Sequence, residues 1–141
     1  MTATRHAWCR LVALAALPAW TAAASAACGD ALGAGKLVAA SAAYEVAFRP
    51  DPAPIAVSRH FALDIAVCPK AGANPPTSLA VDAHMPAHRH GMNYRPTVAM
   101  LAPGRYRAEG LLFHMPGEWE FRFDLSAAGA SERAAIRTHV P

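Results

Sequence analysis

Short runs in which apolar and polar residues alternate, separated by proline, glycine and asparagine, constrain the fold more than any other feature of this chain. A period of two puts the apolar side chains on one face of a β-strand, whereas an amphipathic helix needs a period near 3.6. The clearest run spans residues 118–125, with aromatic or aliphatic residues at the odd positions and charged residues at the even ones. The sequence therefore predicts an all-β domain.

The alternating runs predict about seven strands. They cover residues 44–48, 61–67, 79–85, 97–101, 105–115, 119–125 and 134–139. Turn residues between them favour an immunoglobulin-like β-sandwich. Three prolines exclude regular structure from residues 49–54, and the run 105–115 changes its inward face near Gly110, which indicates a bulge. The alanine-rich residues 39–43 fit either a helical turn or an irregular segment.

The first 26 residues have the order of a secretory signal peptide. Arg5 and Arg10 precede the apolar residues 11–20, and small residues follow up to an Ala24-Ser25-Ala26 cleavage site. The apolar stretch is shorter than the about 20 residues that a membrane helix needs. We therefore expect residues 1–26 to be removed and residues 27–141 to form one periplasmic or secreted domain.

Two cysteines remain after this cleavage, because Cys9 leaves with the signal peptide. In an oxidising compartment a disulfide between Cys28 and Cys68 is the simplest pairing. The alternative is a lipid anchor, because residues 25–28 resemble a lipoprotein cleavage site in which Cys28 is acylated. Ser25 stands where such sites usually carry leucine.

The charge balance and the absent motifs exclude several classes of function. Without Arg5 and Arg10 the 13 lysines and arginines become 11, against 10 acidic residues, which leaves a net charge of +1. This balance gives no basis for a nucleic-acid partner. The sequence has no glycine-rich phosphate loop, no nucleophile elbow and no cysteine left free for catalysis, so we expect no enzyme activity.

A cluster of histidine and methionine lies between residues 84 and 115. It consists of His84, Met85, His88, His90, Met92, Met100, His114 and Met115. Imidazole binds copper in either oxidation state and thioether sulfur favours Cu(I), so the mixture indicates copper, as Cu(I) or Cu(II), more than zinc. The ligands expected first are His84, His88, His90 and Met92, followed by Met85, His114 and Met115.

Strand directions give the same residues both a functional and a structural explanation. If the strands at 79–85, 97–101 and 105–115 run up, down and up, the segments at Met85 and Met115 end at one pole of the sandwich. The period of two points both methionines into the core, where methionine is common filler, and points His84 and His114 to solvent. These two histidines meet only if their strands are neighbours. Capture of Zn(II) or Ni(II) by the histidines alone is a further hypothesis.

Three segments of the chain resemble a known family. They are Val-Asp-Ala-His-Met-Pro-Ala-His-Arg-His-Gly-Met at 81–92, Pro-Gly-Arg-Tyr at 103–106 and Leu-Phe-His-Met-Pro-Gly-Glu-Trp-Glu-Phe at 112–121. Together they resemble the YtkA-like domain of small exported proteins, found near FixH-like and copper-handling sequences, over roughly residues 42–125. The resemblance implies an immunoglobulin-type sandwich that handles copper. Periplasmic copper carriers often use His-x-Met as half of their site, whereas here His114 and Met115 are adjacent, so that design does not transfer whole.

The sequence thus predicts a periplasmic copper carrier or buffer that passes the ion to a periplasmic or membrane protein partner. The alternative is a metal-independent interaction module. Such a module would use the same pole to dock, for example as an assembly factor for a membrane respiratory or efflux complex.

Overall fold

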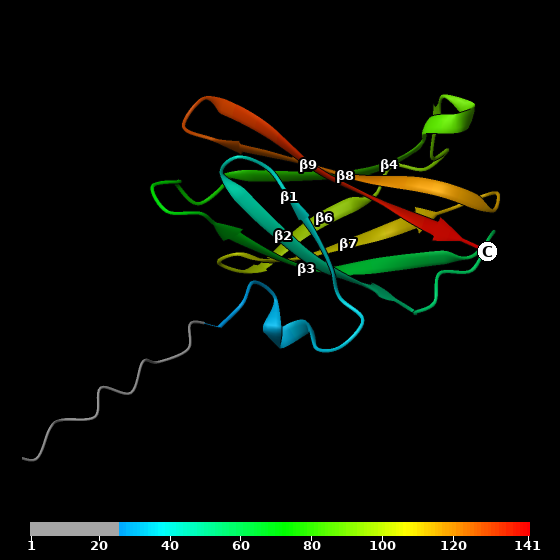
Figure 1. Ribbon diagram of the computed structural model, residues 1–141, viewed down its shortest axis with the longest axis horizontal. Helices are drawn as coiled ribbons and strands as arrows, with labels where there is room; N and C mark the ends of the chain where they lie inside the picture. The colour runs from blue at the N-terminus through cyan, green and yellow to red at the C-terminus, as the bar shows by residue number, and fades with distance from the viewer. Residues whose placement is uncertain (1–25) are drawn as a thin grey trace, which may run out of the picture.

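The computed structural model describes residues 26–141, and its regular secondary structure is almost entirely β-strand (Figure 1). The predicted signal peptide lies outside the described residues, except for Ala26. The strands are β1 (Leu37–Ala40), β2 (Tyr44–Asp51), β3 (His60–Pro69), β4 (Ser78–Met85), β5 (His90–Gly91), β6 (Thr97–Ala102), β7 (Arg105–Leu112), β8 (Gly117–Ala127) and β9 (Ala130–Val140). Two 3₁₀ turns, η1 (Asp30–Leu32) and η2 (Pro86–His88), complete the elements. No helix among the described residues has the length and apolar character to cross a membrane.

The nine strands form one antiparallel sheet in the order β5-β4-β8-β9-β1-β2-β3-β7-β6. The sheet curls on itself, so that β4, β8 and β9 lie over β2, β3 and β7 as two packed layers (Figure 1). The predicted all-β, sandwich-like fold is confirmed, with nine strands in place of about seven. The two additional strands are the short β1 and β5, of which β1 takes in Ala39 and Ala40 from the alanine-rich segment.

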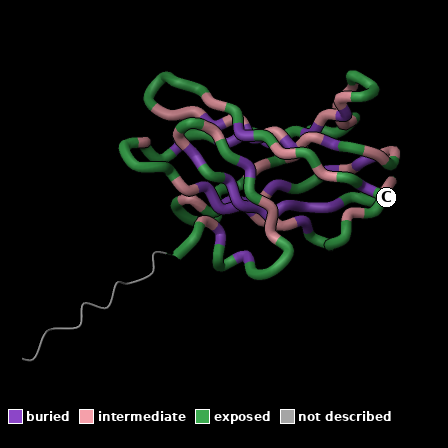
Figure 2. The backbone as a smooth tube through the Cα atoms, in the orientation of Figure 1, coloured by how far each residue is buried: buried purple, intermediate pink, exposed green. Residues whose placement is uncertain are grey.

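The core lies between the two layers and is made by the inward positions of the alternating runs (Figure 2). The ring centroids of Phe48 and Phe121 are 5.0 Å apart, and Phe113 stacks on Trp119 at 4.3 Å. No polar or charged residue in 26–141 is fully buried. Burial of aromatic and aliphatic side chains, at about 25 cal/mol per Å² of apolar surface, therefore supplies the main force that holds the layers together.

The bulge predicted near Gly110 is present. Phe61 pairs with Leu111 whereas Leu63 pairs with Ala108, so two residues of β7 lie opposite one residue of β3. Gly110 has a φ of 87°, which glycine adopts without the steric cost of a Cβ atom. The extra residue lets both Ala108 and Leu111 point into the core.

The expectation that residues 49–54 lie outside regular structure is wrong for residues 49–51. Strand β2 continues through Pro50, which pairs with Leu63 of β3. On its other side β2 last pairs with β1 at Phe48. Beyond that point a proline removes no ladder hydrogen bond on the open side of the strand, which is where strand prolines are tolerated.

The predicted disulfide between Cys28 and Cys68 is present. It ties the segment before η1 to the end of β3. Next to Cys28, Leu32 packs against Ala47 and Ala66 on the outside of the sheet. The N-terminal segment is thereby held to the domain by a covalent bond and by a small apolar contact.

Candidate metal centre

Three of the predicted ligands gather at one end of the sandwich. His88 closes η2, His90 belongs to β5 beside the end of β4, and His114 follows β7. The ring centroid of His90 lies 5.8 Å from that of His88 and 5.0 Å from that of His114. The segments at Met85 and Met115 therefore end at the same pole, as predicted. We call His88, His90 and His114 the histidine cluster.

The buried indole of Trp119 lies against the histidine cluster. Its ring centroid is 5.8 Å from that of His90 and 5.5 Å from that of His114. The indole Nε1 donates a hydrogen bond to the carbonyl of Met115 at 3.0 Å. A side chain fixed in the core thus positions the segment that carries His114. The sequence predicts Trp119 only as a core residue, because its contact with the histidines depends on the non-local order β5-β4-β8.

One ring nitrogen in each of His90 and His114 has no hydrogen-bond partner in the described structure. Nδ1 of His90 lies 3.1 Å from the carbonyl oxygen of Gly91. A carbonyl only accepts, so Nδ1 carries the proton and Nε2 keeps its lone pair, which is the usual arrangement of a metal-bound histidine. Nδ1 of His114 is buried and has no hydrogen-bond partner in the described structure. An unpartnered buried nitrogen costs about 1–3 kcal/mol, which a bound ion would offset.

The methionines lie in two places. Met85 is buried beneath the turn that follows Met115. A side chain at position 117 in place of glycine would have its Cβ atom only 3.1 Å from the methyl group of Met85. Met115 is half-buried and packs on the core, so the inward direction predicted for both residues is confirmed. Met92 lines a cleft between β4 and β6. Met100 is exposed on β6.

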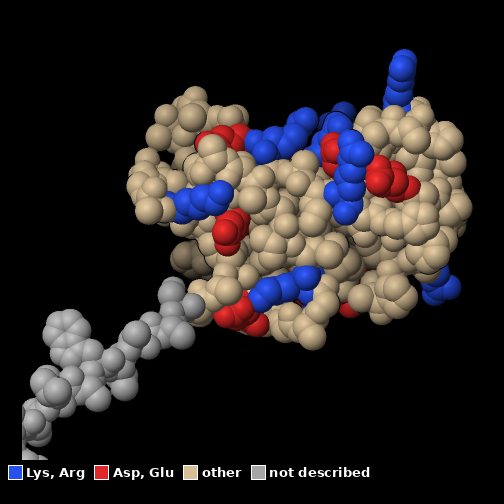
Figure 3. All heavy atoms as spheres, viewed as in Figure 1, with Lys and Arg blue, Asp and Glu red and all other residues tan. Residues whose placement is uncertain are grey.

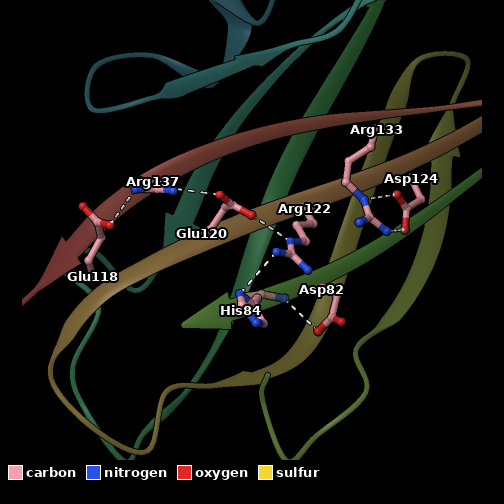
Figure 4. Close-up of polar contacts among 9 residues, drawn as sticks. Asp82, His84, Glu118, Glu120, Arg122, Asp124, Arg133 and Arg137 are labelled. Carbon is pink, nitrogen blue, oxygen red and sulfur yellow. Dashed lines mark hydrogen bonds and ion pairs between the residues drawn. The ribbon is translucent and has the colours of Figure 1, made fainter. Parts of the chain in front are cut away.

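His84 does not join the histidine cluster. It lies on the outer face of β4, opposite Met85, and its Nδ1 accepts a hydrogen bond from Nη2 of Arg122 at 3.2 Å (Figure 4). Strand β4 has β8 and β5 as neighbours, so the condition for a contact between His84 and His114 is not met. The outward direction predicted for His84 is confirmed.

The outward direction predicted for His114 is wrong. Its Nδ1 is buried, and its ring lies against Trp119. The strand expected over 105–115 ends at Leu112, so the period of two stops before His114 and no longer sets the direction of its side chain.

The outer face around His84 carries a network of ion pairs (Figure 4), and Figure 3 shows basic and acidic side chains next to one another on the surface. Glu120 accepts a hydrogen bond from Arg122 at 2.8 Å and lies 3.4 Å from Arg137, which also pairs with Glu118 at 3.2 Å. The hydrogen bond from Arg122 is the main reason that the pKa of Glu120 lies below its usual 4.5. This network explains the charged positions of the run 118–125 as a solvated outer face.

Replacing Glu120 with glutamine is expected to lower the free energy of unfolding by about 0.5–1 kcal/mol at neutral pH. Because the pKa of Glu120 is lower in the folded state than in the unfolded chain, its contribution is fully present above about pH 4.5 and is lost as the pH falls through the folded value. Urea unfolding of wild type and of the Glu120→Gln variant, from pH 7 down to pH 2.5, measures how the difference between their free energies of unfolding shrinks. Glu118→Gln, on the exposed end of the network, should show a smaller difference, and a Glu120 effect independent of pH would contradict the assignment.

Imidazole and thioether are donor types that suit copper, but these side chains are not arranged as a metal site among the described residues. In residues 26–141 no group of three or more His, Cys, Asp or Glu side chains is arranged to hold a metal ion. Two imidazoles that share one ion through bonds of about 2.0 Å have ring centroids about 4.5–6 Å apart. The separations of His90 from its two neighbours fall in this range. A thioether ligand would supplement these imidazoles.

Fold and site together define a small all-β domain with a histidine cluster on the rim of its core. Comparison with known proteins found no family model, no curated protein and no solved structure that matches the chain. The resemblance to the YtkA-like family therefore stays a prediction.

Proposed function

We propose that this protein binds copper at the histidine cluster and acts as a carrier or buffer outside the cytoplasm. The observation that carries the proposal is the pair His90 and His114, whose ring centroids lie 5.0 Å apart. One of these rings keeps a free Nε2 lone pair, and the other has a buried Nδ1 without a partner. The thioether sulfur atoms of Met85 and Met115 on the same end of the domain add the soft donors that favour Cu(I).

The exposure of the histidine cluster suits an ion that is exchanged. His88 is exposed, whereas His90 and His114 are half-buried on the rim of the core. An ion held there is accessible to the ligands of a receiving protein. The proposed protein is a non-catalytic carrier in the periplasm or secreted space, with a periplasmic or membrane protein as the recipient of the ion. The alternative of acylation at Cys28 requires the sulfur atom that the disulfide with Cys68 uses in this structure.

In this proposal the order of expected ligands differs from the order expected from the sequence, in which His84 and Met92 were among the first. His90 and His114 come first, His88 is the third imidazole, and Met85 and Met115 are the thioethers whose segments end at the same pole. His84 is engaged by Arg122 on the outer face, and Met92 lines the cleft between β4 and β6. Neither is assigned to the copper site.

Replacing both His90 and His114 with alanine is expected to weaken Cu(I) binding more than about 100-fold, because loss of a direct ligand should exceed the 10–100-fold effect of an outer partner. The measurement is an anaerobic titration of the purified metal-free protein against a competing chromophoric chelator. Circular dichroism and urea unfolding check that the variant is folded.

Two single variants are the matched controls. His84→Ala, on the outer face of β4, and His139→Ala, exposed on β9, each remove one imidazole outside the histidine cluster and should leave the affinity unchanged. An affinity that survives the double change, or falls equally in the controls, would contradict the site. Met85→Leu with Met115→Leu should weaken Cu(I) selectively; unchanged Cu(I) binding would favour Zn(II) or Ni(II) capture by the histidines alone.

A further inference from the structure

Left-handed backbone at residues other than glycine occurs three times in residues 26–141. The residues are Ser58, Arg89 and Ala128, with φ angles of 59°, 56° and 48°. A residue with a Cβ atom adopts this conformation at a steric cost, so the surrounding structure has to impose it. Such positions concentrate at binding and active sites. Two of the three, Ser58 and Arg89, are tied to the segments that carry the histidine cluster.

Arg89 lies between two members of the histidine cluster in the chain. The turn η2 ends at His88, and the amide of Arg89 donates to the carbonyl of Pro86 at 3.3 Å. The left-handed φ of 56° and ψ of 34° at Arg89 reverse the chain, so that His90 pairs with Met85 and β5 returns along β4 (Figure 1). An extended residue at position 89 would carry the chain away from β4 instead.

The sequence forms this turn against its local preference. Glycine and asparagine are the residues that adopt left-handed backbone most readily in turns, whereas this chain has arginine at position 89. Pairing of the returning chain with β4 holds the turn in place. His84 pairs with Gly91, and the amide of Met92 donates to the carbonyl of Ala83 at 3.2 Å.

The reversal at Arg89 sets the relation between two imidazole rings. His88 belongs to a 3₁₀ turn and His90 to a strand, so neither the helical nor the strand period relates the directions of their side chains. The ring centroids nevertheless lie 5.8 Å apart. The same reversal brings the ring of His90 to 5.0 Å from that of His114.

Ser58 is tied to the other side of the histidine cluster. Its amide donates to the carbonyl of Phe113 at 2.7 Å, and Phe113 directly precedes His114. Ala128 is different, because it lies in the turn between β8 and β9, at the opposite end of β8 from Trp119. It is therefore a left-handed residue outside the histidine cluster.

We propose that Arg89 is a positioning residue of the copper site. Its left-handed backbone, and not its guanidinium group, holds the rings of His88 and His90 together before an ion arrives. An ion then binds without first having to order the hairpin between β4 and β5, which raises the affinity. The inference rests on the proposed copper function for its effect on affinity, and on the backbone geometry for the arrangement of the rings.

Three variants test the backbone separately from the charge, because each removes the guanidinium group. Glycine and asparagine adopt left-handed backbone, whereas β-branched valine does not. In the anaerobic Cu(I) titration of metal-free protein, Arg89→Gly and Arg89→Asn should stay within about threefold of wild type. Arg89→Val should bind at least about tenfold more weakly, as expected for loss of a group that orients a ligand. Ala128→Val, the matched control, should leave the affinity unchanged.

A second measurement uses the metal-free protein and needs no copper. Nuclear Overhauser contacts between the ring protons of His88 and His90 should be present in wild type, Arg89→Gly and Arg89→Asn, and absent in Arg89→Val. If wild type shows this pattern but binds no Cu(I), the proposed function fails and the positioning by Arg89 stands. The two proposals are thereby separated.

Two results would overturn the positioning role. Equal weakening of Cu(I) binding in all three variants would assign the effect to the guanidinium group. Ring contacts and affinity that persist in Arg89→Val would show that the left-handed turn is not needed. Circular dichroism checks the fold, and if Arg89→Val does not fold, Arg89→Ala takes its place. Alanine carries an unbranched Cβ atom, so a smaller loss of affinity is expected, and no loss would count against the proposal.

Discussion

Replacing Trp119 with alanine is expected to lower the free energy of unfolding by about 3–5 kcal/mol, the range for removal of a buried tryptophan. The side chain is fully buried, stacks on Phe113 at 4.3 Å and lies against His90 and His114. Its loss removes aromatic contacts in the core and also removes the indole ring that lies against His90 and His114. Urea unfolding, with the midpoint and the m-value fitted separately, measures the change.

Trp119→Phe is the matched control for this prediction. Phenylalanine keeps much of the apolar surface but cannot donate the hydrogen bond from Nε1 to the carbonyl of Met115. We expect a smaller loss of about 1–2 kcal/mol. A loss below about 1 kcal/mol for the alanine variant would contradict the position of Trp119 in the core.

Removal of the Cys28–Cys68 disulfide is expected to lower the free energy of unfolding by about 3–4 kcal/mol. The bond joins residues 40 positions apart, so without it the unfolded chain gains the conformational entropy of an open loop. The measurement compares urea unfolding of wild type with that of the variant in which both cysteines are serine.

Wild type in the presence of a reductant is the control for the disulfide. It should unfold at the same urea concentration as the double serine variant, because both lack the same constraint. A variant as stable as the oxidised wild type would contradict the entropic contribution assigned to the bond. The packing of Leu32 on Ala47 and Ala66 would then be enough to hold the N-terminal segment.

Much of the fold is predictable from the sequence because strand periodicity is local. The run 118–125 contains its own evidence for a strand with one buried face, and β8 spans it. The position of the bulge also follows from a local change of inward face at Gly110. Strands β1 and β5 are too short to show a period, and Pro50 is tolerated only because β1 ends earlier on that side.

The candidate site is predictable only in part. The sequence identifies the histidine and methionine segment and the convergence of its two ends at one pole. It does not separate His84, which lies on the outer face with Arg122, from His90, which lies beside Trp119. That distinction depends on the pairing of β4 with β8 and β5, which joins residues far apart in the chain.

The sequence by itself determined the all-β class, the strand runs and the set of side chains available for chemistry, and it predicted the pairing of the two cysteines beside the alternative of a lipid anchor. Each of these follows from local periodicity, turn residues or composition. Only the tertiary structure decided which histidines lie together, which one lies on the outer face with Arg122, and where the sheet leaves an open cleft. Strand order and the curl of the sheet arise from long-range packing, in which burial of the aromatic core outweighs the preference of any single segment.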